Sequence, residues 1–159
     1  MTAALKTNKD VMQVVRSAVA QHGATRDELI PILTDVNHEL GYIPHEAVAE
    51  VSRLIGMPQT QLFSVASFYE MLSLRPRGRH VIKFCENAPC HVVGGRQVWQ
   101  TLRDELKVKS GETTADDRFT LLTTSCLGIC AVGPVVVIDD DVYGNVEPGQ
   151  VAGILARYV

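Results

Sequence analysis

Cys85-Glu-Asn-Ala-Pro-Cys90 and, further along the chain, Cys126-Leu-Gly-Ile-Cys130 together contain every cysteine of the protein. Both stretches are rich in small and turn-forming residues, which leave backbone N–H groups free to approach whatever the sulfurs bind. All four thiols thus lie in two pairs that are close in the sequence. We therefore expect the two pairs to hold a common group between them.

Several uses of paired thiols have to be compared. Structural disulfides are typical of secreted chains, and a thioredoxin-type redox centre needs Cys-x-x-Cys, which this sequence lacks. A structural zinc site is the main alternative, because zinc accepts cysteine pairs at both spacings, although it usually stabilises units that cannot fold alone. His91 follows Cys90, but a Rieske centre also needs a histidine in the second stretch. We interpret His22, His38, His45 and His80 as surface residues.

A 2Fe–2S cluster fits the four thiols best. Each iron needs two thiolates close together, and an excursion of three or four residues brings two sulfurs to such positions. The backbone N–H groups of Ala88 and Gly128 are placed to donate to sulfur, and such bonds stabilise a negatively charged cluster. The residues thus predict one 2Fe–2S cluster, with zinc as the alternative.

Composition narrows the class of protein. The sequence has 159 residues, of which 46% are hydrophobic and 21% charged, as is typical of soluble globular proteins. The formal net charge of −3 argues against nucleic acid as a partner. No stretch reads as the ~20 mostly apolar residues of a spanning helix, and no secretory signal is visible at the N-terminus. We expect a cytoplasmic protein without direct membrane insertion.

The first half of the sequence has helical periodicity. From Asp10 to about Met71, apolar residues recur at helical spacing and predict four helices, with ends near Gly23, Gly41 and Gly56. Thr25 and Glu28 form a predicted capping box before the second helix. We predict a flexible N-terminus over residues 1–9 and a helical bundle over residues 10–75.

The second half has the pattern of an α/β unit. It follows a basic linker rich in proline and glycine, residues 75–80. His80–Phe84 and Phe119–Thr124 are predicted strands that run into the first and second cysteine pairs. The other predicted elements are short strands at 134–139 and 142–145, and helices at about 95–106 and 148–158. Residues 80–159 therefore predict a sheet with its site in the loops at the strand ends.

These features resemble a known family. The cysteine pattern, with Gly133-Pro134 before an apolar strand and then Val142-Tyr-Gly-Asn145, resembles the thioredoxin-like 2Fe–2S ferredoxins. Leu40-Gly-Tyr-Ile-Pro44 and Val65-Ala-Ser-Phe-Tyr69 extend the resemblance to the E-subunit family of NADH-quinone oxidoreductase. That family serves complex I, NAD-linked and electron-bifurcating hydrogenases, and NAD-dependent formate dehydrogenases. Ala131-Val-Gly133 departs from its pattern, which has glycine first and alanine last.

The resemblance implies a fold and a role. The fold is a thioredoxin-like 2Fe–2S ferredoxin domain preceded by a small N-terminal helical bundle that docks on a partner. Carried over to this sequence, Cys85 and Cys90 bind one iron, and Cys126 and Cys130 bind the other. FMN and the NADH site belong to a flavoprotein subunit, and further iron–sulfur or catalytic subunits complete the complex.

The chain is therefore expected to be a non-catalytic electron-transfer subunit of an NAD(H)-dependent oxidoreductase. Two alternatives stay open on the residues alone. One is a zinc-stabilised binding module with no redox role, and the other is a free-standing thioredoxin-like ferredoxin.

Overall fold

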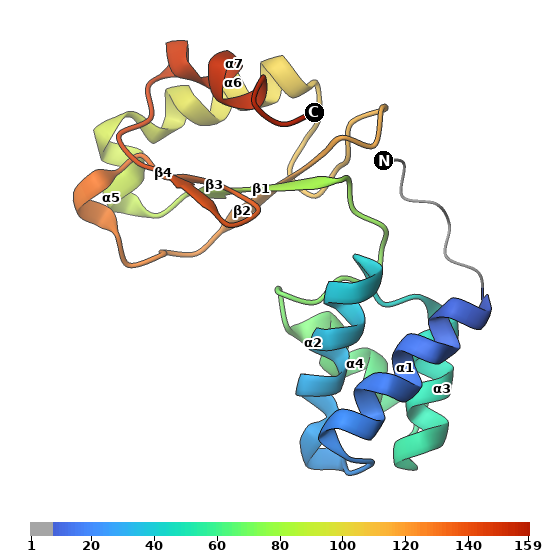
Figure 1. The fold of residues 1–159 in the computed structure, drawn as a ribbon. Coiled ribbons are helices and arrows are strands. Elements are labelled where there is room, and N and C mark those ends of the chain that lie inside the picture. Colours follow the sequence, from blue (N-terminus) through green and yellow to red (C-terminus); the bar gives the residue numbers. More distant parts are fainter. Residues whose placement is uncertain (1–7) are drawn as a thin grey trace. The chain divides into compact units, whose positions relative to one another are not determined.

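A computed structural model describes residues 8–159 (Figure 1). The chain divides into two compact units, one that ends at Pro76 and one that begins at Arg77. The predicted flexible segment 1–9 lies outside the described residues, except for Asn8 and Lys9, where the first helix begins. No helix within residues 8–159 is long and apolar enough to cross a membrane.

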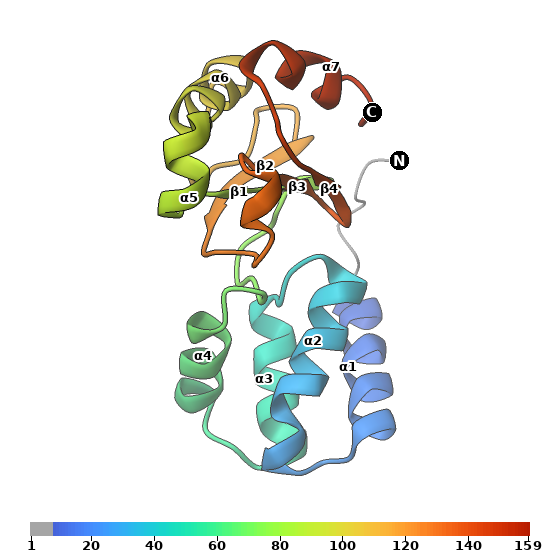
Figure 2. The ribbon, with the colours of Figure 1, turned by 90° about the vertical axis from the view of Figure 1, so that its left-hand side faces the viewer.

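Within residues 8–76 the chain forms the four predicted α-helices. They are α1 (Asn8–His22), α2 (Leu29–Leu40), α3 (His45–Ile55) and α4 (Gln59–Phe68), which lie side by side in Figure 2. Their apolar faces pack into one core that includes Val15, Ile32 and Val51. The predicted capping box is wrong: Thr25 makes no side-chain cap, because residues 26–28 form a separate 3₁₀ turn before α2 begins.

A buried carboxylate joins two of these helices. Both Glu50 oxygens accept hydrogen bonds from Arg53, at 2.8 Å each, and one of them also accepts from Arg16 of α1, at 3.1 Å. The Arg53 guanidinium is the main cause that lowers the Glu50 pKa from 4.5 to about 2. The charge of Glu50 is thus compensated inside the helical unit.

Within residues 77–159 four strands form one sheet in the order β2-β1-β3-β4. They are β1 (His80–Cys85), β2 (Phe119–Thr124), β3 (Val136–Ile138) and β4 (Asp141–Tyr143). β1 and β2 are parallel, with Cys85 opposite Thr124, whereas β3 runs antiparallel to both β1 and β4. Because β1 and β2 are parallel, the segments that follow both strands leave the sheet at the same edge.

Helices complete this unit. They are α5 (Ala88–Cys90), a π-helical segment η2 (His91–Gly95), α6 (Arg96–Leu106) and α7 (Val151–Leu155), with 3₁₀ turns η3 (Cys130–Val132) and η4 (Pro148–Gln150). α6 and α7 lie on the same face of the sheet in Figures 1 and 2, and their apolar residues share a core with the strands. The predicted α/β fold preceded by helices is confirmed.

Two sequence-based expectations in this unit need correction. The last helix ends at Leu155, and the Arg118 guanidinium donates to the backbone carbonyls of Leu155 and Tyr158 at this end. His80 is not a surface residue: its ring is mostly buried and pairs with Asp139 at 2.7 Å, which fixes the turn between β3 and β4.

Candidate metal centre

The first cysteine pair is buried at the end of the sheet. Cys85 ends β1 and Cys90 ends α5, with 2% and 1% of their surfaces exposed. The backbone of Val135 contacts both: its carbonyl accepts the Cys85 N–H at 3.2 Å, and its N–H donates to the Cys90 sulfur. Strand, helical turn and Val135 thus hold this pair inside the protein.

Burial affects the pKa of Cys90. Loss of solvent raises the pKa of the Cys90 thiol, and the neighbouring Cys85 thiol raises that pKa further. The hydrogen bond from the Val135 N–H opposes this rise. Since an isolated buried thiolate is unfavourable, a cation bound at the sulfurs would compensate its charge.

The second pair lies in an exposed loop after β2. The sulfurs of Cys126 and Cys130 are 3.3 Å apart. Gly128 has φ of 80°, which turns its N–H toward the Cys126 sulfur at a distance of 3.4 Å. This hydrogen bond is the main cause that lowers the Cys126 pKa, whereas the contact with Cys126 raises the Cys130 pKa. The predicted Gly128 N–H contact to sulfur is therefore present.

The two pairs meet at Gly133. A Cβ added there would lie 3.2 Å from the Cys90 sulfur and 3.4 Å from the Cys130 carbonyl oxygen. Electrostatic interactions also link Cys130 to Cys85 and to Cys90. The loop of the second pair therefore lies against the sulfur of the first.

Gly95 packs closely against the backbone of Cys90. A Cβ at this position would come within 2.5 Å of the Cys90 carbonyl oxygen and 3.3 Å of the Phe84 ring. The kinked segment His91–Gly95 can pass this close to Cys90 only because Gly95 has no side chain. Gly133 thus lies close to the Cys90 sulfur, and Gly95 lies close to the Cys90 backbone.

The donor set fits a 2Fe–2S cluster. All four thiols are free, they lie as two pairs, and backbone N–H groups donate to a sulfur in each pair. Thiolate pairs and N–H···S bonds are what a two-iron cluster requires, whereas zinc requires four ligands around one ion.

Exposed apolar side chains lie between or shortly after the cysteines of each pair in the sequence. We call this set the apolar collar; its members are Val92, Val93, Leu127, Ile129 and Val132. Val93 approaches the site most clearly, because a Cβ at Gly133 would lie 3.2 Å from the Val93 side chain and also 3.2 Å from the Cys90 sulfur. The collar is drawn from both cysteine loops.

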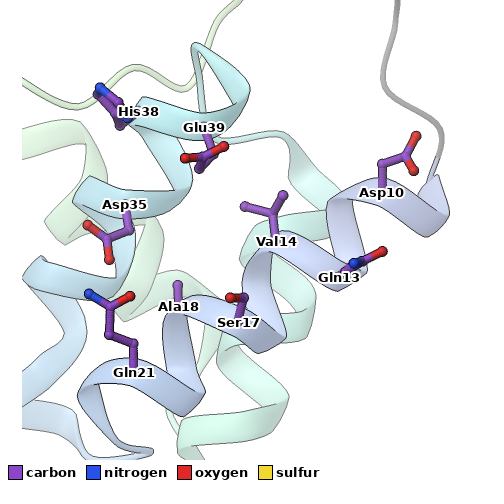
Figure 3. A pocket seen from close by; sticks show the side chains of 9 residues that line it. All are labelled: Asp10, Gln13, Val14, Ser17, Ala18, Gln21, Asp35, His38 and Glu39. Carbon is purple, nitrogen blue, oxygen red and sulfur yellow. The ribbon is translucent and has the colours of Figure 1, made fainter.

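A pocket also lies between α1 and α2 of the helical unit (Figure 3). Its lining residues are mainly polar: Asp10, Gln13, Val14, Ser17, Ala18, Gln21, Asp35, His38 and Glu39. Asp35 pairs with His22 at 2.7 Å, so His22 is part of the helical packing rather than a free surface residue. The pocket lining contains no cysteine, and we assign the chemistry to the thiols.

A comparison with protein families decides the assignment of the fold. The model of the thioredoxin-like [2Fe-2S] ferredoxin family matches residues 15–159. The chain belongs to this family. The resemblance predicted from the cysteine pattern is thereby confirmed, and the family supports a 2Fe–2S cluster on this ferredoxin.

Named relatives extend the comparison. This ferredoxin is 37% identical to the E subunit of NADH-quinone oxidoreductase from Salmonella typhimurium, over 81% of this chain and 78% of the relative. It is 35% identical to the NADP-reducing hydrogenase subunit HndA of Solidesulfovibrio fructosivorans, over 94% of this chain and 85% of the relative.

A solved structure shares the fold. An NAD+-reducing [NiFe]-hydrogenase in the air-oxidised state superposes with a TM-score of 0.70 at 21% identity. The match covers 82% of this ferredoxin but only 22% of that hydrogenase chain, so this ferredoxin corresponds to about a fifth of it.

The structure brings the four predicted cysteines to one end of the sheet and adds residues that sequence reasoning does not single out as part of the site. Val135 contacts the first pair from a distant part of the chain, whereas Gly95 contacts Cys90 from within the same segment. Gly133-Pro134 belongs to the family resemblance, and the close approach of Gly133 to Cys90 gives that step a physical reason.

Proposed function

We propose that this ferredoxin is an electron-transfer subunit of a multisubunit NAD(P)-linked oxidoreductase and carries one 2Fe–2S cluster. The observation that carries the proposal is the convergence of two free thiol pairs at one end of a thioredoxin-like sheet. Relatives that share most of its length are subunits of NADH-quinone oxidoreductase and of an NADP-reducing hydrogenase. When bound, the cluster accepts and donates single electrons.

In this proposal each cysteine pair holds one iron. Cys85 and Cys90 bind the buried iron, and Cys126 and Cys130 bind the exposed one. The N–H groups of Val135 and Gly128 stabilise negative charge on the sulfurs. Because the second pair is exposed, its loop is the face through which an electron partner approaches.

The partner is a flavoprotein subunit that binds FMN and NAD(P)H. A nicotinamide cofactor exchanges a hydride, which carries two electrons, whereas a 2Fe–2S cluster exchanges one. A flavin converts between the two, and this sequence contains neither a G-x-G-x-x-G nor a P-loop motif for a nucleotide. The hydride chemistry therefore belongs to the partner, and further iron–sulfur or catalytic subunits use the electrons.

Two uncharged surfaces are suited to docking on such a partner. On α4 and just after it, Phe63, Phe68 and Met71 are exposed, Phe68 by 80%, and no charged residue occurs from Leu54 to Tyr69. In the ferredoxin unit, three members of the apolar collar lie in a stretch without charge, residues 119–138. Exposed aromatic and aliphatic clusters of this kind mark protein interfaces. A cytoplasmic location agrees with four reduced thiols.

Anaerobic purification of the affinity-tagged full chain from its native host tests this function. We expect a flavoprotein to co-purify, FMN to be released on denaturation, and NADH or NADPH to bleach the visible absorption of the cluster. A chain that purifies alone and is reduced only by an artificial reductant would instead be a free-standing ferredoxin.

Phe68→Asp tests the α4 surface in the same purification. A charge at the centre of an apolar interface is unfavourable, so we expect the yield of flavoprotein to fall at least about tenfold. Val159→Asp is the matched control, because Val159 is similarly exposed but lies at the C-terminus. Equal yields from both variants would remove α4 from the interface.

A further inference from the structure

We propose that in the cluster-free chain Cys126 and Cys130 close into an intramolecular disulfide, whereas Cys85 and Cys90 remain thiols. The disulfide itself follows from the positions of the four thiols. Its consequence for cluster loading rests on the function proposed above.

The exposed pair is already close to the geometry of a disulfide. The two sulfurs are 3.3 Å apart, so they need to approach by only about 1 Å to reach a bonding distance. Residues 125–132 are all exposed, and Gly128 between the cysteines adopts a left-handed conformation that closes the loop. Closure therefore requires movement of a surface loop and not of the core.

The buried pair is protected from oxidation because an oxidant cannot reach its sulfurs, and not because the two sulfurs are far apart. Cys85 and Cys90 also contact each other, but they are 2% and 1% exposed. A disulfide oxidant has to reach one sulfur in line with its own S–S bond before any exchange can occur. The packing of Val135 against this pair blocks that approach.

The oxidant in this proposal is a low-molecular-weight disulfide such as oxidised glutathione. The Cys126 thiolate attacks one of its sulfurs, the glutathione S–S bond breaks, and one glutathione leaves as a thiolate. The Cys130 thiolate then attacks the Cys126 sulfur of the mixed disulfide and releases the second glutathione. The two cysteines lose two electrons and two protons in total, and the oxidant becomes two glutathione thiols.

The consequence concerns cluster loading. A cysteine in a disulfide cannot ligate iron as a thiolate, so a closed second pair leaves half of the ligand set unable to bind. Reduction of the disulfide restores both thiols. The disulfide of the exposed pair, which we call the lock, thus reversibly prevents cluster binding by a chain that has lost its cluster or has not yet received one.

Disulfide mapping of the cluster-free wild-type chain tests the proposal. The chain is incubated anaerobically with oxidised glutathione, quenched with an alkylating agent in denaturant, digested and analysed by mass spectrometry. We expect Cys126–Cys130 closure at least about ten times faster than any oxidation of Cys85 or Cys90, since thiol oxidation follows exposure. Equal rates, a disulfide between the pairs, or glutathione adducts that persist without closure would overturn it.

Two single variants isolate the steps. Cys130→Ser should accumulate a glutathione adduct on Cys126, because the resolving thiol is missing, and Cys126→Ser should give no intramolecular disulfide with Cys130. Closure of Cys126 onto Cys85 or Cys90 in the Cys130→Ser chain would contradict the protection of the buried pair.

Reconstitution with iron and sulfide then tests the lock. The closed wild-type chain should take up at least about tenfold less iron than the same chain after dithiothreitol treatment, because closed thiols cannot ligate. Equal uptake would remove the lock. If the reduced chain also takes up no iron and sulfide, the proposed function fails while the disulfide map still stands.

Discussion

The two cysteine pairs of this ferredoxin both contribute sulfur atoms, but one pair is buried and the other is exposed. Cys85 and Cys90 lie in the core, at the end of a central strand and in a helical turn, and the backbone of Val135 bonds to both. Cys126 and Cys130 lie in an exposed loop whose main internal contact with sulfur is the Gly128 N–H.

Because of this difference, the two pairs contribute to the site in different ways. The core fixes the first pair in position, and burial raises the pKa of Cys90. The loop leaves the second pair solvated and free to adjust. We therefore expect the same substitution to have unequal effects in the two pairs. The effect on the site should be largest at the ligands themselves and smallest in the helical unit.

Serine substitution compares the pairs directly. Cys90→Ser should abolish cluster binding, because a buried hydroxyl next to a core is difficult to ionise and cannot be replaced by solvent. Cys126→Ser should retain a cluster with a shifted visible spectrum, since solvent and the Gly128 N–H can stabilise an oxygen ligand. Iron content and absorption after reconstitution measure both variants. Equal loss of iron would show that burial does not distinguish the pairs.

Gly133→Ala tests the contact between the pairs. The added Cβ would lie 3.2 Å from the Cys90 sulfur, and we expect overpacking to destabilise the cluster-free chain by about 1–3 kcal/mol and to lower cluster yield. Gly153→Ala in α7 is the control, because a Cβ there meets nothing within 4 Å and should stabilise by about 0.4–1 kcal/mol. Urea unfolding measures both changes, and an unaffected Gly133→Ala chain would mean that the loops are less tightly packed.

Gly128→Ala tests the exposed loop alone. A non-glycine residue at φ of 80° is disfavoured by about 1–2 kcal/mol, so the loop should relax and weaken the N–H···S bond to Cys126. We expect faster loss of the cluster to an iron chelator, with the fold preserved. Gly149→Ala, whose Cβ has no neighbour within 4 Å, should leave that rate unchanged. Equal rates in the two variants would remove Gly128 from cluster stabilisation.

Glu50→Gln should have the smallest effect on the site, because its partners are in the helical unit. The folded pKa of Glu50 is about 2 against an ordinary 4.5, so its ionised form stabilises the fold above about pH 4.5. That contribution is lost as the pH falls from 4.5 toward 2. The variant should therefore unfold at lower urea concentration near neutral pH, and the difference from wild type should shrink across that window.

The cluster spectrum of the reconstituted Glu50→Gln chain should match that of the wild type. A shifted spectrum would show that the helical unit influences the thiols.

Sequence periodicity is sufficient for the elements that carry strong local signals. The strand Phe119–Thr124 has its predicted bounds, and Gly41 and Gly56 end α2 and α3 as expected. The cysteine spacing likewise predicts which thiols pair, because each pair is local in the chain.

Contacts between distant residues are not predictable in the same way. Arg118 donates to the carbonyls of Leu155 and Tyr158 at the end of the last helix, and nothing in the local sequence of that helix indicates this contact. The same holds for Val135, which bonds to Cys85 and Cys90 through its backbone, so its side chain carries no signal of the role. The predicted helix at about 95–106 is confirmed as α6, whereas the separate short turn α5 before it, Ala88–Cys90, is not indicated by periodicity.

Iron and acid-labile sulfide analysis of the anaerobically purified chain tests the shared ligation by Cys85, Cys90, Cys126 and Cys130 most directly. A 2Fe–2S centre requires about two irons and about two sulfides per chain, together with visible absorption. A colourless protein that contains about one zinc per chain and no sulfide would contradict the account.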